Sequence, residues 1–316
     1  ITAGTKTKIL IVSTPNGMNL FYKIWNDSVS KRNNYVPFEI HWSQVPGRDE
    51  DWKEETIRNT SEHQFRQEFE TEFLGSSNTL ISAVALRELA APPSIKIDKY
   101  RQVRPPNTQG TYVCLVDVAG GNLGDYSTIT VIDITDNIFR VCYVWKCNQT
   151  RPMALPPIII DICNKYNKAY LVIEKNGLGN GVIDLCWNEY EYENIASTTV
   201  EDKKQIISSG FSRSSYLGVE MTKSVKRLGC TVLKGLVEEK KLIDLTEEQI
   251  FELSNFVAKA GSFSASSGNN DDLVMNLVMF SWLTTQKYFK DLIGISGNLI
   301  EEIEESPPVF AGTNMT

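Results

Sequence analysis

The chain has 316 residues, and 39 acidic against 32 basic side chains leave it with a formal net charge of −7. This length, with 41% hydrophobic residues, is enough for one large domain or two smaller ones. The net charge excludes a protein that coats nucleic acid over its whole surface, and without a run of about 18 apolar residues we expect no membrane contact.

The N-terminal part of the chain carries patterns for a strand and then helices. Residues 7–14 are short, apolar and β-branched, which predicts a buried strand. Residues 18–30 and 50–73 repeat apolar residues at helical spacing, and Gly75 is typical of a helix C-cap. Four prolines within residues 92–110 favour a linker.

A different pattern begins after this proline-rich stretch. It predicts three strands, at residues 111–118, 126–134 and 138–147. A helix is expected after the two prolines at 156–157, and a fourth strand at residues 169–174. Four helices are then expected, at residues 177–189, 222–241, 246–258 and 271–286, the last of them amphipathic. This order predicts an α/β fold with a mixed sheet flanked by helices.

Carboxylates stand at the ends of these apolar segments. Asp117 ends the first of the four strands, Glu174 ends the fourth, and Asp272 begins the last helix. A fourth acid, Asp125, follows a glycine-rich loop. Burying a carboxylate costs several kcal/mol unless it is paired or bound to metal. Two Mg²⁺ held about 4 Å apart by carboxylates can hydrolyse phosphodiesters.

These acids therefore have two interpretations. Each alone is most simply a solvated cap, because Asp is favoured at helix N-termini in any protein. Their order along the chain matches the metal site of an RNase H-like nuclease. The pattern alone leaves both interpretations open.

Five segments of the chain together resemble one protein family. Three contain the acids just described: LVDVAGGNLGDYST at 115–128, LVIEKNGLG at 171–179 and NNDDLVMNLVMFSWL at 269–283. Two precede them: STPNGMNLFYKIW at 13–25 and QFRQEFETEFLG at 64–75. The first three resemble the nuclease motifs of the large terminase subunit of T-even-type tailed phages. The other two resemble its ATPase coupling motif and the end of its ATPase-to-nuclease connection.

The resemblance implies an RNase H-like (RuvC-like) nuclease domain over residues 106–316. It also implies that residues 1–75 are the C-terminal remnant of a P-loop-type ATPase domain with its connection, and that 76–105 are a linker. Because the sequence begins with Ile1 and has no Walker A motif, we expect it to be part of a larger protein and to have no ATPase activity.

The resemblance also assigns roles to single residues. Asp117, Glu174 and Asp272 correspond to the acids that bind two catalytic Mg²⁺ or Mn²⁺ ions, and Asp125 corresponds to an assisting acid in the same site. A further acid, Asp271, lies beside the third ligand. The loop GLGNG after Glu174 does not have the spacing of a dinucleotide-binding loop, so we expect a tight turn there and no organic cofactor.

A basic stretch follows the fourth strand. Residues 203–241 hold nine Lys or Arg against three Glu, a local balance of +6. Lys223, Lys226 and Arg227 share one helical face, where they are expected to contact DNA phosphates. A solvated helix face is the alternative.

The function implied is endonucleolytic cutting of concatemeric double-stranded DNA at the start and end of viral DNA packaging. The implied partners are viral DNA, the portal protein and the small terminase subunit. The implied location is the cytoplasm of the infected bacterial host and, transiently, the capsid portal, but not the mature virion. Two alternatives remain, an RNase H-like Holliday-junction resolvase and a non-catalytic phage docking module.

Overall fold

The structure, a computed structural model, describes residues 8–15, 20–71, 73, 79–202, 204–208, 215–259, 261–266 and 268–293. The chain divides into two units, Ile1–Thr79 and Leu80–Thr316. In the part of the chain that the structure describes, no helix is long and apolar enough to cross a membrane.

The first unit is helical. Its helices are α1 (Leu20–Val29), α2 (Glu50–Asn59) and α3 (Glu62–Glu68), with a short 3₁₀ turn at Trp42–Gln44. The single helical pattern over 50–73 thus forms two helices, because Ser61 caps α3 by accepting a hydrogen bond of 3.1 Å from the backbone of Gln64. Gly75, the expected C-cap, lies outside the described residues.

The prediction of a strand over residues 7–14 is wrong for residues 8–14, the part of it that the structure describes. Residues 8–15 have no regular structure, and the side chains of Leu10 and Val12 are 88% and 82% exposed. A strand needs a hydrogen-bonded neighbour, and no strand occurs among the described residues of this unit before Thr79. The apolar run alone therefore did not determine its conformation.

The second unit contains the mixed sheet that the sequence predicts. Its order is β1-β2-β5-β4-β3-β6, and β10 also pairs with β5. Neighbours are antiparallel except that β6 runs parallel to β3, and β10 parallel to β5. The bounds are β1 Ile95–Ile97, β2 Tyr100–Gln102, β3 Tyr112–Asp117, β4 Ser127–Asp133, β5 Phe139–Cys147, β6 Tyr170–Ile173 and β10 Leu242–Ile243.

The stretch expected to be a linker, residues 76–105, is largely structured. The second unit begins at Leu80, and helix α4 (Ala83–Glu88) and strands β1 and β2 follow. Strand β2 pairs with β5, with Tyr100 opposite Trp145. The prolines lie before β1 and after β2, so they bound the strands and leave the ladder hydrogen bonds intact.

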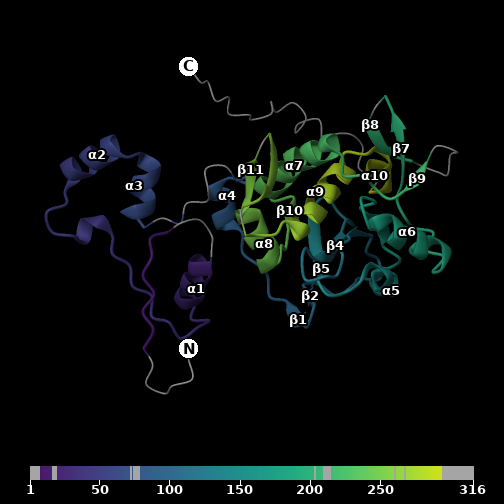
Figure 1. Ribbon diagram of the computed structural model, residues 1–316, viewed down its shortest axis with the longest axis horizontal. Helices are drawn as coiled ribbons and strands as arrows, with labels where there is room; N and C mark the ends of the chain where they lie inside the picture. The colour runs from purple at the N-terminus through teal and green to yellow at the C-terminus, as the bar shows by residue number, and fades with distance from the viewer. Residues whose placement is uncertain are drawn as a thin grey trace. The chain divides into compact units, whose positions relative to one another are not determined.

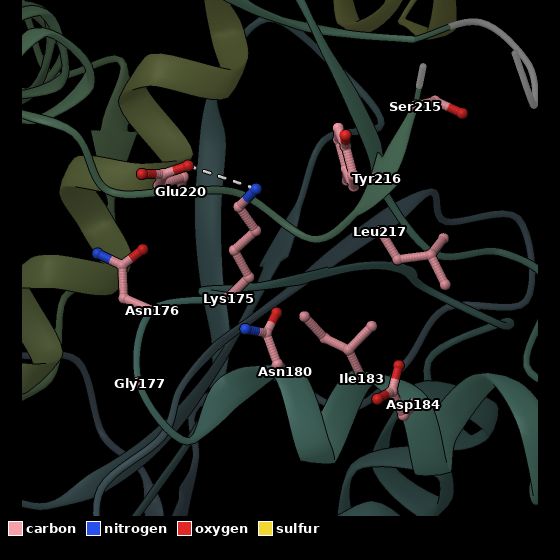
Figure 2. Close-up of a pocket in the computed structure, with 10 residues that line it drawn as sticks. All are labelled: Lys175, Asn176, Gly177, Asn180, Ile183, Asp184, Ser215, Tyr216, Leu217 and Glu220. Carbon is pink, nitrogen blue, oxygen red and sulfur yellow. Dashed lines mark ion pairs between the residues drawn. The ribbon is translucent and has the colours of Figure 1, made fainter. Parts of the chain in front are cut away.

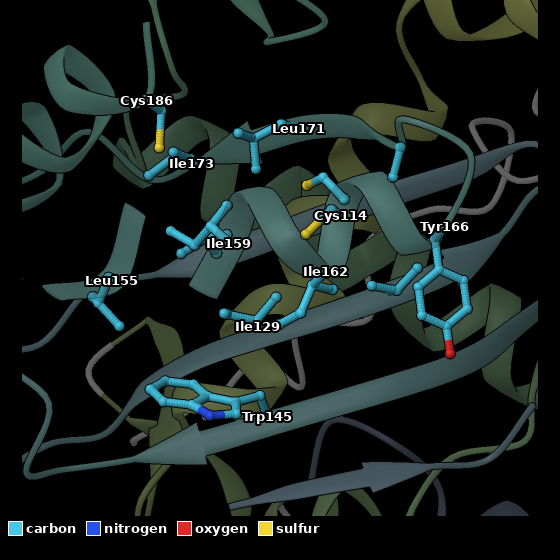
Figure 3. Close-up of a cluster of buried hydrophobic side chains, with 14 of the residues drawn as sticks. Cys114, Ile129, Trp145, Leu155, Ile159, Ile162, Tyr166, Leu171, Ile173 and Cys186 are labelled. Atoms are coloured by element: carbon cyan, nitrogen blue, oxygen red, sulfur yellow. The ribbon is translucent and has the colours of Figure 1, made fainter. Parts of the chain in front are cut away.

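Helices cover both faces of the sheet (Figure 1). On one face lie α5 (Leu155–Lys165) and α6 (Gly179–Asn188), and between them and the sheet is a hydrophobic core. Figure 3 shows Leu155, Ile159 and Ile162 of α5 directed toward sheet residues such as Ile129. On the other face lies α9 (Asp272–Thr284), which contacts β3 and β4 and is itself contacted by α7 (Lys223–Glu238), α8 (Glu247–Ser254) and α10 (Lys287–Leu292).

Helix α9 confirms the predicted helix but not its predicted amphipathic character. All of its residues except Met275 are buried, as expected of a helix enclosed on every side. The approach of α7 is close, because a Cβ on Gly229 would lie 2.4 Å from the carbonyl oxygen of Val278. Glycine is therefore required where the two helices cross.

Smaller elements complete the second unit. Strands β7 (Ser197–Glu201), β8 (Lys204–Ile207) and β9 (Tyr216–Leu217) form a three-stranded sheet, and β11 (Phe256–Lys259) and β12 (Ser262–Ala265) form a hairpin. The helix predicted over 246–258 therefore ends at Ser254, and its last residues belong to β11.

Candidate active site

Two of the predicted acids are placed side by side by the parallel pairing of β3 and β6. Val116 is the register partner of Ile173, and the N–H of Glu174 donates a hydrogen bond of 3.0 Å to the carbonyl of Val116. Asp117 and Glu174 are the next residues on the two strands, and neighbouring strands lie about 4.8 Å apart. Val116 and Ile173 belong to the core under α5 and α6, so alternation directs the two acids to the opposite face.

The third acid reaches the same face from helix α9. Asp272 is its first residue, and the Thr128 hydroxyl donates to its backbone carbonyl at 3.2 Å. The N–H of Tyr126 donates to the Asp272 carboxylate at 3.3 Å. Because Thr128 is the register partner of Asp117, these contacts place the start of α9 beside the end of β3.

The glycine-rich turn after Glu174 allows this arrangement. Gly177 has φ +57°, and a Cβ on Gly179 would lie 1.8 Å from the carbonyl oxygen of Glu174. Only glycine permits α6 to begin this close to the end of β6. The prediction of a tight turn is confirmed.

The electrostatic setting of the three acids opposes their ionisation. Asp117 and Glu174 are half-buried, and Asp272 is 8% exposed. Burial, and then the charges of Glu174 and Asp272, hold the pKa of Asp117 well above its usual value. Burial also raises the pKa of Glu174, although the charge of Lys226 lowers it in part. Burial raises the pKa of Asp272 as well, and there the Tyr126 N–H and the charge of Lys146 oppose the rise.

The three acids have nearby positive charges, Lys226 and Lys146, but no ion-pair contact with them. No Lys or Arg in the described part of the chain forms an ion pair with any of the three acids. Their side chains do not close around one point either: among the described residues, no group of three His, Cys, Asp or Glu is arranged to enclose a metal ion. The backbone nevertheless brings the three acids to one face of the sheet.

Two further acids lie near the third ligand. Asp125 is exposed on the loop before β4, and its charge raises the pKa of Asp272. Asp271 precedes α9 and also raises the pKa of Asp272, but its own carboxylate accepts a hydrogen bond of 3.1 Å from the N–H of Ala265. Asp125 thus lies at the rim of the site, whereas Asp271 is engaged with β12.

The three basic residues of the predicted DNA-binding face all lie at the start of α7, but only Lys226 shifts the pKa of one of the acids. Lys226 is half-buried, its charge lowers the pKa of Glu174, and its Nζ lies 5.6 Å from the ring centroid of Phe256. Lys223 and Arg227 are exposed on the same helix. Lys226 is therefore the basic side chain of this set that belongs to the acidic site.

A buried ion pair beside Asp272 was not found from the sequence. Glu252 of α8 is 3% exposed and lies 2.5 Å from Nζ of Lys146 on β5. Burial raises the pKa of Glu252 to about 7 against the attraction of Lys146. The sequence could not show that Glu252 is buried and paired, because most single acids within helices face solvent.

A cavity of about 630 Å³ opens next to Glu174 and was also not predicted. Figure 2 shows Lys175 reaching across it to Glu220, with Nζ 3.4 Å from the Glu220 carboxylate. The same Nζ lies 5.1 Å from the ring centroid of Tyr216. The lining residues are Lys175, Asn176, Gly177, Asn180, Ile183, Asp184, Ser215, Tyr216, Leu217 and Glu220.

Comparison with known families gives two matches. Residues 115–282, more than half of the chain, match the terminase RNaseH-like domain. Residues 1–87 match the N-terminal part of the terminase large subunit of T4likevirus type. The first match contains Asp117, Glu174 and Asp272.

Comparison with solved structures finds similar folds. The large terminase nuclease of thermophilic phage G20c, in crystal structures with bound magnesium and with bound cobalt, is 18% identical in sequence with a TM-score of 0.50. Each comparison covers 65% of this chain and 97% of the G20c chain. At this identity the likeness concerns the fold, and it confirms the predicted RNase H-like architecture.

Proposed function

This chain belongs to the large terminase family, and from that membership we propose that it is the metal-dependent endonuclease of a viral DNA-packaging motor. It cuts concatemeric double-stranded DNA when packaging starts and when it ends. The observation that carries the proposal is the placement of Asp117, Glu174 and Asp272 on one face of the sheet, without an ion-pair partner among the described residues.

The donor set fits two Mg²⁺ or Mn²⁺ ions. Mg²⁺ prefers carboxylate oxygens, and the three acids offer only such donors. Burial raises the pKa of all three acids, and for Asp117 the charges of Glu174 and Asp272 raise it further; a bound cation would stabilise their ionised forms. The G20c nuclease has been crystallised with magnesium and with cobalt, which supports a divalent cation here.

In this proposal Asp117, Glu174 and Asp272 hold the cations, and Asp125 assists from the rim. When bound, the cations would activate water and stabilise the charge that develops on the scissile phosphate. The chain's own part is to fix the acids on rigid elements, two at strand ends and one at the start of an enclosed helix. Lys226 places a positive charge beside Glu174, where it attracts the DNA backbone.

We extend the proposal to the whole chain as follows. Residues 1–75 are the end of a P-loop-type ATPase domain and its connection, which the N-terminal family match supports. The nuclease domain, expected over 106–316, includes the strands and helix from Leu80 onward. Its partners are viral double-stranded DNA, the portal protein and the small terminase subunit. It acts in the cytoplasm of the infected bacterium and transiently at the capsid portal, and the mature virion lacks it.

A plasmid-nicking assay tests this function. The purified chain should nick and linearise supercoiled plasmid with Mn²⁺ or Mg²⁺, should need no ATP because the sequence has no Walker A motif, and should be inactive in EDTA. Binding of plasmid without any cutting at either metal would favour a docking module instead. Cutting confined to four-way junctions would favour a resolvase.

The basic residues of α7 give a second test. Replacing Lys223, Lys226 and Arg227 with Ala should weaken DNA binding for every sequence. It should also flatten the plot of log binding constant against log salt concentration by up to about 0.9 per lost phosphate contact. Fluorescence anisotropy in EDTA measures this without cleavage. Lys240→Ala is the control, because Lys240 follows α7 and pairs with Glu88. If the triple variant keeps the wild-type slope, these residues are a solvated face.

A further inference from the structure

We propose that Lys146 and Glu252 are a positioning pair that holds the start of α9, and with it Asp272, in place for metal binding. The inference rests on the proposed function. It concerns two residues that are not among the proposed metal ligands. Neither belongs to the segments that resemble the nuclease motifs.

The carboxylate of Glu252 caps α9 from a different helix. Its Oε2 accepts hydrogen bonds from the N–H groups of Leu273 at 2.8 Å and Val274 at 3.2 Å. The first N–H groups of a helix have no partner within the helix. Asp271, the residue in the N-cap position, makes no side-chain cap and instead accepts from Ala265. Glu252 therefore supplies the cap that the local sequence does not.

The other oxygen of Glu252 ties this cap to the sheet. Oε1 lies 2.5 Å from Nζ of Lys146. Lys146 is on β5 opposite Thr128 of β4, and Thr128 itself donates to the carbonyl of Asp272. The Lys146 Nζ also lies 4.4 Å from the ring centroid of Tyr126, whose N–H donates to the Asp272 carboxylate.

Asp272 is thus held in two ways, through the cap of its helix and through the hydrogen bond to its carboxylate. Lys146 contacts one residue of each, Glu252 of the cap and Tyr126 of the hydrogen bond. A carboxylate at position 252 can serve two helix N–H groups and one ammonium group at once. An amide there has only one acceptor oxygen. Groups that orient a metal ligand typically change metal affinity or activity by about 10- to 100-fold when they are removed.

The test measures metal binding directly, as the Mn²⁺ concentration at the midpoint of the rise in melting temperature. Glu252→Gln and Lys146→Met should each raise this midpoint about tenfold or more, with the rate of plasmid nicking at limiting Mn²⁺ reduced accordingly. The double variant should shift the midpoint by less than the product of the single shifts, because both residues act through one contact. Lys146→Arg keeps the charge and should restore most of the affinity.

Glu248→Gln is the matched control, because Glu248 lies on the same helix α8 but pairs with Arg101 on β2 at 2.5 Å. Its Mn²⁺ midpoint should equal that of the wild type. If Glu252→Gln does not fold, Lys146→Met still tests the pair, since it leaves both hydrogen bonds to α9 in place. Wild-type midpoints in both Glu252→Gln and Lys146→Met would overturn the positioning pair alone. A wild-type protein with no Mn²⁺ response would overturn the proposed function, and the pair with it.

Discussion

Asp117→Asn should lower the rate of plasmid cleavage by about a thousandfold or more at saturating Mn²⁺. Metal ions supply several kcal/mol of charge stabilisation in phosphodiester hydrolysis, and about 1.4 kcal/mol corresponds to a factor of ten. Asp117 lies next to both other acids, because Glu174 follows the β6 partner of Val116 and because Thr128, the register partner of Asp117, donates to the Asp272 carbonyl. An amide of nearly the same size removes the charge and leaves the shape of β3 unchanged.

The rate should be measured from the loss of supercoiled plasmid over time, with far-UV circular dichroism as the check that the variant is folded. Asp98→Asn makes the same chemical change at an exposed turn between β1 and β2, and it should cut at the wild-type rate. Full activity of a folded Asp117→Asn variant at equal metal would rule out the site.

The same substitution should have the opposite effect on stability when no metal is present. In EDTA, Asp117→Asn should melt at the same temperature as the wild type or higher, because one of three repelling, partly buried charges is gone. Added Mn²⁺ should stabilise the wild type by about 2.7 kcal/mol at a hundredfold excess over Kd, since it binds only the folded state. Asp117→Asn should lose most of that gain.

Differential scanning fluorimetry with and without Mn²⁺ measures both effects. Asp98→Asn should keep the full metal response, which separates binding at the site from a general effect of ionic strength. Equal Mn²⁺ responses in wild type and Asp117→Asn would show that the acids share no metal, and a docking module would then be the better interpretation.

In the second unit, local patterns predicted the strands and the helix that carry the acids. The apolar strands that end at Asp117 and at Ile173, just before Glu174, and the helix that begins at Asp272 lie within a residue or two of their predicted bounds. The glycine turn after Glu174 could also be predicted, because its backbone conformation depends on neighbouring residues alone. Strands β1 and β2 could not, because each has three residues and β2 depends on pairing with β5.

The same limit applies to the site. Lys226 shares a helical face with Lys223 and Arg227, so spacing could not show that only Lys226 shifts the pKa of one of the acids. The pairing of Lys146 with Glu252 spans 106 positions of the chain. No periodicity in either segment carries that information, because it arises only when α8, α9 and the sheet pack together.

The close contact at Gly179 limits how the proposed nuclease could be redesigned. A library that aims to change cutting preference can vary Asn122 and Leu123, which are exposed in the loop before Asp125, but not Gly121, where a Cβ would lie 2.5 Å from the carbonyl oxygen of Thr150. At position 179, even alanine would push against the carbonyl of Glu174 and move a proposed ligand with it. Variants at position 179 would differ in how far they displace Glu174 and not in which DNA they prefer. A library should therefore keep Gly179 and vary other positions.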